Sequence, residues 1–241
     1  MPRIVNEAEY TARRNQILEL AQQMVYTKGY EQMTIQDILD GLQISKGAFY
    51  HYFGSKQALL EALIERLVEE AEKIQAPILQ APDLTAMEKL KRYFYTLGRW
   101  KTERKSYLLN LMQVWYNDEN ALVRQKLNTA SIQRFAPVLT AIIHQGMQEG
   151  VLNPQYPKQA GEVVLVLMLS LGEMLARALL VESLTIHDLP RLVGAAAAYQ
   201  DAIERVLGAP TGNIQLFDPA TLGEWLIVED KHVKTAQQAG R

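Results

Sequence analysis

The sequence predicts an all-helical fold, and three observations carry this prediction. Apolar residues recur three or four positions apart along almost every segment, which is the spacing of one face of an α-helix. No segment keeps the alternation of apolar and polar residues that a half-buried strand shows. Only nine prolines and fourteen glycines interrupt these segments over 241 residues. The content of 48% apolar and 22% charged residues is that of a soluble chain with a sizeable core.

The first two helices are predicted from their apolar stripes and their start signals. The first covers about residues 11–27 and ends near Gly29. The second begins after Thr34, a preferred capping residue, and Asp37 places a carboxylate near the positive end of that helix. It is expected to break at about residues 41–43.

The third and fourth helices follow without a long loop. Ser45 caps a short third helix, where Ile44 and Phe49 occupy the two positions of a hydrophobic staple. Ser55 then caps a fourth helix, which is expected to end near Pro77 because proline interrupts helical hydrogen bonding.

The rest of the chain is predicted to hold five further helices, over about residues 85–100, 105–116, 119–149, 158–181 and 187–207. Pro137 is expected to kink or break the longest of them. Beyond Gly208 the chain becomes irregular, apart from a short helix capped by Asp218 with Pro219 at its first position. The last dozen residues are predicted to be disordered.

Composition narrows the class of protein. The chain has no cysteine, which excludes disulfides and cysteine-based metal sites and fits a cytoplasmic protein. Its N-terminus lacks the apolar region of a signal peptide. The apolar run 163–181 contains Glu173 and Arg177, which disfavour a bilayer position, so a helix buried between protein surfaces is expected and no membrane partner. Net charge is −2, but no acid lies between Asp40 and Glu61.

The short third helix has an unusual outward face. On a helical wheel Phe49 and Phe53 point toward the core, whereas Gly47, Ala48 and His51 point away from it. Tyr50 and Tyr52 lie on the flanks, and Lys46 lies in the first turn. A small centre with hydrogen-bonding rims suits a helix pressed into a DNA groove, which makes the second and third helices a helix-turn-helix. The alternative is an amphipathic helix with incidental surface tyrosines. Residues 54–56 form no Walker A loop, because its glycine pattern is absent.

Residues 13–63 resemble the DNA-binding segment of the TetR (tetracycline-repressor-like) family of bacterial transcriptional regulators. The matching residues are Thr34, Ile35, Ile38, Ser45, Lys46, Gly47, Tyr50, Phe53, Lys56 and Leu59. The resemblance implies that Thr34, Ser45, Tyr50, Tyr52 and Lys56, with His51 as an addition, hold phosphates. It implies that Lys46, Gly47 and Ala48 approach base edges. Two positions depart from the family pattern, Leu39 in place of alanine and Gln43 in place of the turn glycine.

The same resemblance implies the organisation and function of the whole chain. Residues 1–55 would form the DNA-binding domain, 56–208 a helical domain for ligand binding and dimerisation, and 209–241 an extension. The implied function is that of a homodimeric repressor, released from a pseudo-palindromic DNA operator by a small-molecule inducer. The helices around 158–181 and 187–207 would form the dimer interface.

A ligand pocket is expected among the aromatic and methionine residues of the C-terminal helices. The candidates are Tyr93, Trp100, Met112, Trp115, Tyr116, Phe135, Met147 and Met168. Neither a cofactor nor a metal is expected. A helical-bundle enzyme and a helical module that does not bind DNA are the alternatives. The first would need a convergent set of acids, bases or metal ligands, and the four histidines are scattered.

Overall fold

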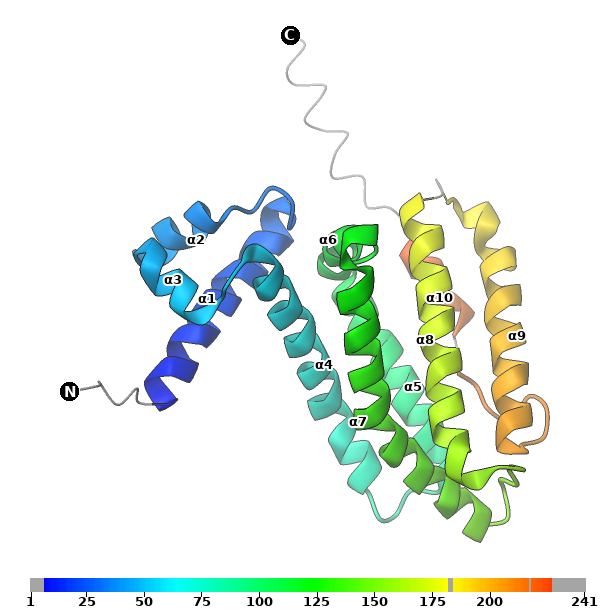
Figure 1. Ribbon diagram of the computed structural model, residues 1–241. Coiled ribbons are helices and arrows are strands. Elements are labelled where there is room, and N and C mark those ends of the chain that lie inside the picture. The colour runs from blue at the N-terminus through cyan, green and yellow to red at the C-terminus, as the bar shows by residue number, and fades with distance from the viewer. Residues whose placement is uncertain (1–6, 182–183, 217, 227–241) are drawn as a thin grey trace. The chain divides into compact units, whose positions relative to one another are not determined.

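A computed structural model describes residues 7–181, 184–216 and 218–226 (Figure 1). In these residues every regular element is a helix, turns and loops connect the helices, and there is no strand. The predicted all-helical class is therefore confirmed. The described part packs as two units. The first comprises the described part of residues 1–82 together with 104–135, and the second comprises 83–103 with the described part of 136–241. The predicted disorder of the last dozen residues lies outside the described residues.

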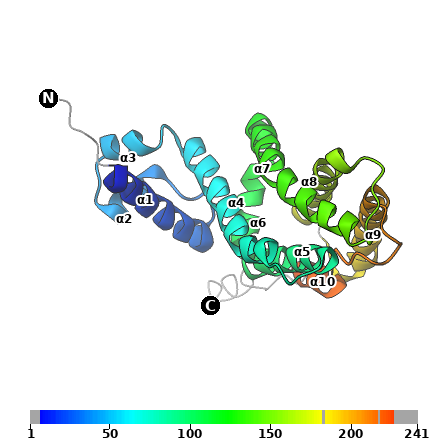
Figure 2. The ribbon, with the colours of Figure 1, turned by 90° about the horizontal axis from the view of Figure 1, so that it is seen from below.

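The first unit contains the N-terminal helices and one later pair. Its helices are α1 (Glu7–Lys28), α2 (Ile35–Leu42), α3 (Lys46–Tyr52), α4 (Lys56–Gln80), α6 (Lys105–Trp115), the 3-10 turn η1 (Asp118–Asn120) and the first half of α7 (Ala121–Gln148). Figure 2 shows α1, α2 and α3 grouped at the start of α4. The core of this group is apolar, and Phe49 of α3 is fully buried at its centre together with Ile38 of α2 and Ala21 of α1. The predicted inward face of α3 is therefore confirmed.

The helices of the first unit begin where the capping residues predict. Thr34 caps α2 by accepting a hydrogen bond from the Asp37 amide, and the Asp37 carboxylate accepts one from the Thr34 amide. Ser45 accepts from the Ala48 amide at 3.1 Å, and Ser55 accepts from the amide three residues into α4 at 3.0 Å. Each cap satisfies an amide that has no partner inside its own helix.

Helix α4 ends three residues after Pro77, as expected, and Pro137 does not break α7; whether Pro137 kinks α7 stays a prediction. Pro77 lies inside α4, which continues to Gln80, and Pro137 lies inside α7, which continues to Gln148. Each proline removes one hydrogen bond to the carbonyl four residues earlier. Those carbonyls belong to Lys73 and Gln133, which are both exposed, so water can replace the missing donor. The division between the two units falls beside Pro137, at residues 135–136.

The second unit contains the remaining helices. They are α5 (Ala86–Glu103), the second half of α7, α8 (Pro157–Val181), the 3-10 turn η2 (Ile186–Asp188), α9 (Leu189–Leu207) and α10 (Pro219–Leu226). Helices α8 and α9 lie side by side, and α10 contacts both α9 and α5 (Figures 1 and 2). The predicted cap of α10 is confirmed, because Asp218 accepts a hydrogen bond from the Ala220 amide at 3.0 Å.

The described part of the C-terminal extension is packed into this second unit. Trp225 Nε1 donates to Thr102 Oγ1 at 2.9 Å, and Arg99 pairs with Glu224 at 2.8 Å. The loop before α10 is held by the buried carboxylate of Glu204, which accepts hydrogen bonds from the amides of Gly212 and Ile214. The functional boundaries expected at residues 55 and 208 stay predictions. In the structure, α4 packs with α1, and α10 packs with α9 and α5.

Candidate nucleic-acid interface

The turn between α2 and α3 is closed by a residue in the left-handed conformation. Gln43 has φ 52° and ψ 44°, and among the described residues other than glycine it alone has a positive φ. Its amide donates to the Asp40 carbonyl, and the Ile44 amide donates to the Leu39 carbonyl at 3.0 Å. This is the hydrogen-bond pattern of a Schellman motif, which usually uses glycine at the left-handed position. Gln43 therefore makes the turn that the family pattern assigns to glycine.

Gly41 contributes close packing to this motif. A Cβ atom at Gly41 would lie 2.6 Å from Cδ2 of Leu20 in α1, so the end of the Leu20 side chain would have to move to admit a side chain there. Its φ is not in the left-handed region, and the bend of the turn resides in Gln43. The missing side chain of Gly41 thus leaves room for the ends of the Leu20 and Met24 side chains of α1.

The outward face of α3 is exposed, as its helical spacing predicts. Ser45, Lys46, Gly47 and His51 are exposed, and 43% of Tyr50 is accessible. A Cβ atom at Gly47 would meet only the Ser45 hydroxyl oxygen, at 3.9 Å, so the space in front of Gly47 is open. Ala48 is half-buried beside it. The face combines an accessible backbone at its centre with an ammonium group and a phenol at its edges, and such a surface can enter a DNA groove.

Charge around this face is locally positive. Within the described part of the chain, Lys46 forms no ion pair, and its ammonium group stands in a stretch without acids. Of the two acids of α2, Asp37 forms an ion pair and Asp40 is exposed without one in the described residues. Asp37 pairs with Lys28 at 2.6 Å, and Asp40 accepts a hydrogen bond from Gln36 at 2.7 Å. Local placement therefore offers positive charge to a polyanion although the whole chain is slightly acidic.

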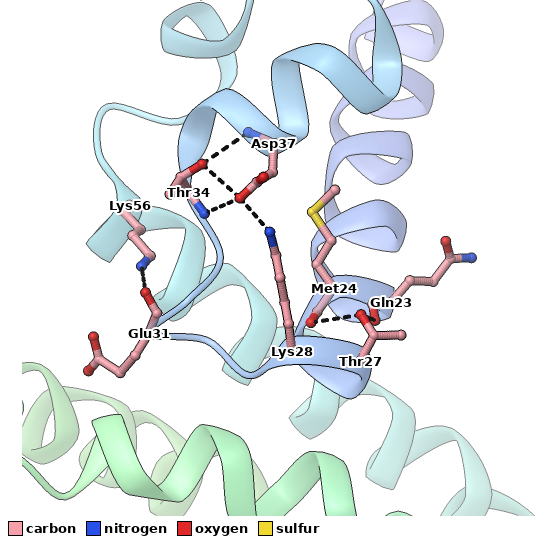
Figure 3. Close-up of polar contacts among 8 residues, drawn as sticks. All are labelled: Gln23, Met24, Thr27, Lys28, Glu31, Thr34, Asp37 and Lys56. Carbon is pink, nitrogen blue, oxygen red and sulfur yellow. Dashed lines mark hydrogen bonds and ion pairs between the residues drawn. The ribbon is translucent and has the colours of Figure 1, made fainter. Parts of the chain in front are cut away.

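Thr34 has its hydroxyl committed within the fold. Figure 3 shows Thr34 Oγ1 donating to Asp37 Oδ2 at 2.7 Å while it accepts from the Asp37 amide. The ion pair with Lys28, followed by the hydrogen bonds from Thr34, lowers the pKa of Asp37 far below its usual range. Lys28 ends α1, so this cluster ties the end of α1 to the start of α2.

Lys56 is also engaged inside the fold. Its ammonium group donates to the Glu31 carbonyl at 3.2 Å (Figure 3). The same ammonium group lies 4.6 Å from the centre of the Tyr30 ring. Tyr30 in turn donates its hydroxyl to the Lys56 carbonyl at 2.7 Å. Partial burial lowers the pKa of Lys56, and the nearby Glu31 carboxylate opposes that shift. Lys56 thus fixes the start of α4 against the loop after α1, and two of its three donors remain for a phosphate.

The C-terminal half of α3 contacts a residue that the sequence patterns do not single out. Tyr10 of α1 lies against both His51 and Tyr52, and Tyr52 is half-buried. One weak sequence signal exists, because Tyr10 and Arg14 are four residues apart and share one face of α1. Arg14 lies over the ring of Phe53 at 5.2 Å.

The predicted ligand residues are divided between the two units. The first unit holds Met112, Trp115, Tyr116 and Phe135, and the second holds Tyr93, Trp100, Met147 and Met168. Tyr93, Trp100 and Trp115 are buried, and the other five are half-buried. The predicted pocket stays a prediction. Among the residues that the structure describes, no group of three or more histidine, aspartate or glutamate side chains is arranged to hold a metal.

A capped helix-turn-helix that presents an exposed, locally basic second helix defines a DNA-binding protein. Comparison with known families identifies which kind. The profile of the bacterial regulatory proteins of the tetR family matches residues 17–63, and that of the tetracyclin repressor-like C-terminal domain matches residues 110–175. The chain belongs to the TetR family of transcriptional regulators, whose members are DNA-binding transcription factors and not enzymes.

Individual relatives are distant. The HTH-type transcriptional regulator YvaF of Bacillus subtilis is 27% identical over 149 residues, covering 56% of this chain and 78% of YvaF. The repressor KstR2 of Mycobacterium tuberculosis is 34% identical over 61 residues, covering 25% of this chain and only 30% of KstR2. A crystal structure of a TetR-family regulator from Pectobacterium atrosepticum has a TM-score of 0.61 at 20% identity, covering 84% of this chain and 98% of that one. The last comparison shows a shared fold.

Proposed function

We propose that this protein is a homodimeric, ligand-responsive repressor that binds a pseudo-palindromic DNA operator and is released by a small molecule. The observation that carries the proposal is the outward face of α3, where Lys46, Gly47 and Tyr50 are exposed around an open backbone. Gly47 lets the helix approach base edges closely, and Lys46 and Tyr50 can reach phosphates or bases beside it. The repressor function of KstR2 supports the expected sign of regulation.

Dimerisation is supported by an apolar surface on α8 and α9. The most apolar 18-residue window of α8 has a mean hydropathy of 2.1, but only 28% of that window is buried. By length and composition this helix could also cross a membrane, and in the described residues no other helix meets that test. Glu173 and Arg177 pair at 2.9 Å on it. A protein partner therefore explains the apolar surface better than a bilayer, in which both charges would be costly.

The exposed residues of this surface suit close contact between helices. Val163 and Val166 of α8 are 40% and 47% exposed, and Ala197 and Ala198 are exposed on α9, which packs against α8. A second copy of the chain would cover these apolar and small side chains. It would also supply the second reading helix, because one seven-residue helix contacts too few bases for a specific site.

Ligand control follows from the connection between the predicted pocket and the DNA-binding helices. Helix α6 carries three of the predicted pocket residues, Met112, Trp115 and, at its end, Tyr116. The same helix contacts α1, where Asn110 Nδ2 donates to the Val25 carbonyl at 3.1 Å. A ligand that binds one arrangement of α6 more tightly would shift the population of α1 positions, and with it the affinity for the operator.

The DNA-binding part is tested by selecting sites from a random pool of duplex DNA. We expect the selected sequences to converge on an inverted repeat whose half-sites lie about 34–36 Å apart. Lys46→Ala should weaken binding to that site and reduce the slope of log affinity against log salt by about one. Lys91→Ala, which removes an exposed lysine of α5, serves as the matched control and should change neither. A pool that fails to converge refutes the DNA-binding proposal.

The dimer is tested separately by sedimentation of the full chain. Wild-type protein should sediment as a dimer, and Val166→Glu should shift it to a monomer because a carboxylate would be buried in the interface. Unchanged sedimentation of Val166→Glu would place the dimer contact elsewhere. The monomeric variant should keep its helical content and lose affinity for the inverted repeat.

A further inference from the structure

The reading helix is too short to be stable alone. Helix α3 has seven residues, and isolated helices of that length do not form in water. Its inward side is anchored by Phe49 and Phe53, which are 0% and 3% exposed. Its N-terminus is held by the Ser45 cap. The C-terminal side chains of α3 on the outward side contact α1.

Three rings meet at this end of α3. The ring of Tyr10 lies 5.5 Å from that of His51, edge to face, and 4.8 Å from that of Tyr52, in a tilted arrangement. His51 and Tyr52 lie 5.1 Å apart, also edge to face. These separations are those of favourable aromatic pairs. We call these three residues the Tyr10 cluster.

Arg14 extends the same contact by one helical turn. Its guanidinium lies 5.2 Å from the centre of the Phe53 ring, within the range of a cation–π interaction. Tyr10 and Arg14 are four residues apart on α1, so they project from one face and together cover three consecutive residues at the end of α3. Helix α1 thus holds the reading helix from outside its apolar core.

We propose that Tyr10 is a positioning residue of the DNA interface: its ring holds His51 and Tyr52 in the orientations in which they contact the DNA backbone. The inference rests on the proposed DNA-binding function and adds a residue of α1 to it. In the described part of the chain, the ring of His51 pairs with the rings of Tyr10 and Tyr52. Without the Tyr10 ring, both side chains become free to rotate and must be ordered when DNA binds, which weakens affinity.

The first test compares three single variants on the selected operator, in full-length protein. Tyr10→Ala should bind the operator about tenfold more weakly, because it removes two ring pairs. Tyr10→Phe keeps the ring and should bind within about twofold of wild type. Tyr95→Ala, which removes a 59% exposed tyrosine of α5, is the matched control and should bind as wild type does. Circular dichroism at the assay temperature confirms that each variant is folded.

Two results would overturn the proposal at this stage. Wild-type affinity in Tyr10→Ala would show that the ring positions nothing. An equal loss in Tyr10→Phe and Tyr10→Ala would show that the hydroxyl itself binds the DNA. Failure of the wild-type protein to select any DNA would be a different result, because it would refute the proposed function and not the role of Tyr10 alone.

A double-mutant cycle separates positioning from a general loss of stability. In a His51→Ala/Tyr52→Ala background, Tyr10→Ala should weaken binding by less than twofold, because the side chains that it positions are gone. A further tenfold loss in that background would show that Tyr10 acts independently of them, which refutes the proposal. A purely structural role of Tyr10 would lower affinity in both backgrounds, so the cycle distinguishes the two.

Discussion

Replacing Gln43 by glycine should stabilise the helix-turn-helix. Gln43 has φ 52° and ψ 44°, close to the centre of the left-handed region. That conformation costs a residue with a Cβ atom about 1–2 kcal/mol, and glycine avoids the cost. Glycine also gives the unfolded chain more freedom, which takes back about 0.4–1 kcal/mol. The difference is a stabilisation of about 0.5–1 kcal/mol, or about 1–4 °C in the unfolding midpoint.

The measurement is a urea titration followed by circular dichroism, in which the midpoint should rise with an unchanged slope. Gln36→Gly is a control for which the opposite change in stability is expected. Gln36 lies inside α2 with an ordinary helical backbone and donates to Asp40 at 2.7 Å, so its replacement should destabilise by about 1 kcal/mol. If Gln43→Gly were neutral or destabilising, the left-handed strain assigned to Gln43 would be wrong.

Three further predictions concern separate features. Gly47→Ala adds a methyl group in open space, so the free energy of unfolding should stay the same or rise by up to about 1 kcal/mol. Its affinity for the operator, measured by titration, should fall. Gly54→Ala is the control: its site is equally open, and its operator affinity should not change. Gln75→Leu should raise the free energy of unfolding, measured by urea titration, by about 1–3 kcal/mol. The reason is that Gln75 is 1% exposed and its Nε2 lacks an acceptor among the described residues. A lower free energy of unfolding would indicate that a bound water accepts from Nε2. The pairing with Lys28 lowers the pKa of Asp37. The ionised carboxylate therefore stabilises the fold above the unfolded pKa of 3.8, and this stabilisation is lost as pH falls through the lower folded pKa. Asp37→Asn should abolish that dependence on acid pH in a pH series of unfolding midpoints.

Helix starts were predictable because their signals are local. Thr34, Ser45, Ser55 and Asp218 all cap the helices that they were expected to cap, since a capping side chain reaches only two or three residues along the chain. The continuation of α7 through Pro137 was not predictable in this way. A proline removes one hydrogen bond and its ring crowds the carbonyl four residues earlier, and whether the helix continues past it also depends on tertiary packing.

The candidate site was predictable in outline. Helical spacing alone places Phe49 inward and Gly47 outward, because the angle between positions on a helix is fixed. Contacts between helices were not accessible from spacing. Tyr10 lies some forty residues before Tyr52, and no local pattern specifies that their rings meet. The direction of the Lys56 ammonium group was also missed, because it is set by a carbonyl and a ring in another segment.

A ligand pocket is harder to predict from sequence than a helix start. Aromatic and methionine side chains at helical spacing fill cores as readily as they line cavities, so composition does not distinguish the two. Trp100 and Trp115 illustrate this, because both are 8% exposed but belong to different packing units. Ligand contacts depend on which side chains face a common space, and that arrangement is a property of the packed helices.

Some residues that carry the family resemblance use their polar groups within the fold, and others are exposed on α3. This difference affects how substitutions are interpreted. Thr34 and Lys56 have their polar groups engaged inside the fold, where they fix the start of α2 and the start of α4. Lys46 and Gly47 have no such commitment and are exposed on α3. Loss of DNA binding after substitution of Thr34 or Lys56 therefore does not by itself identify a DNA contact, because the frame of the reading helix would change as well. Loss after substitution of Lys46 with stability intact does identify one, since nothing in the described fold depends on its ammonium group.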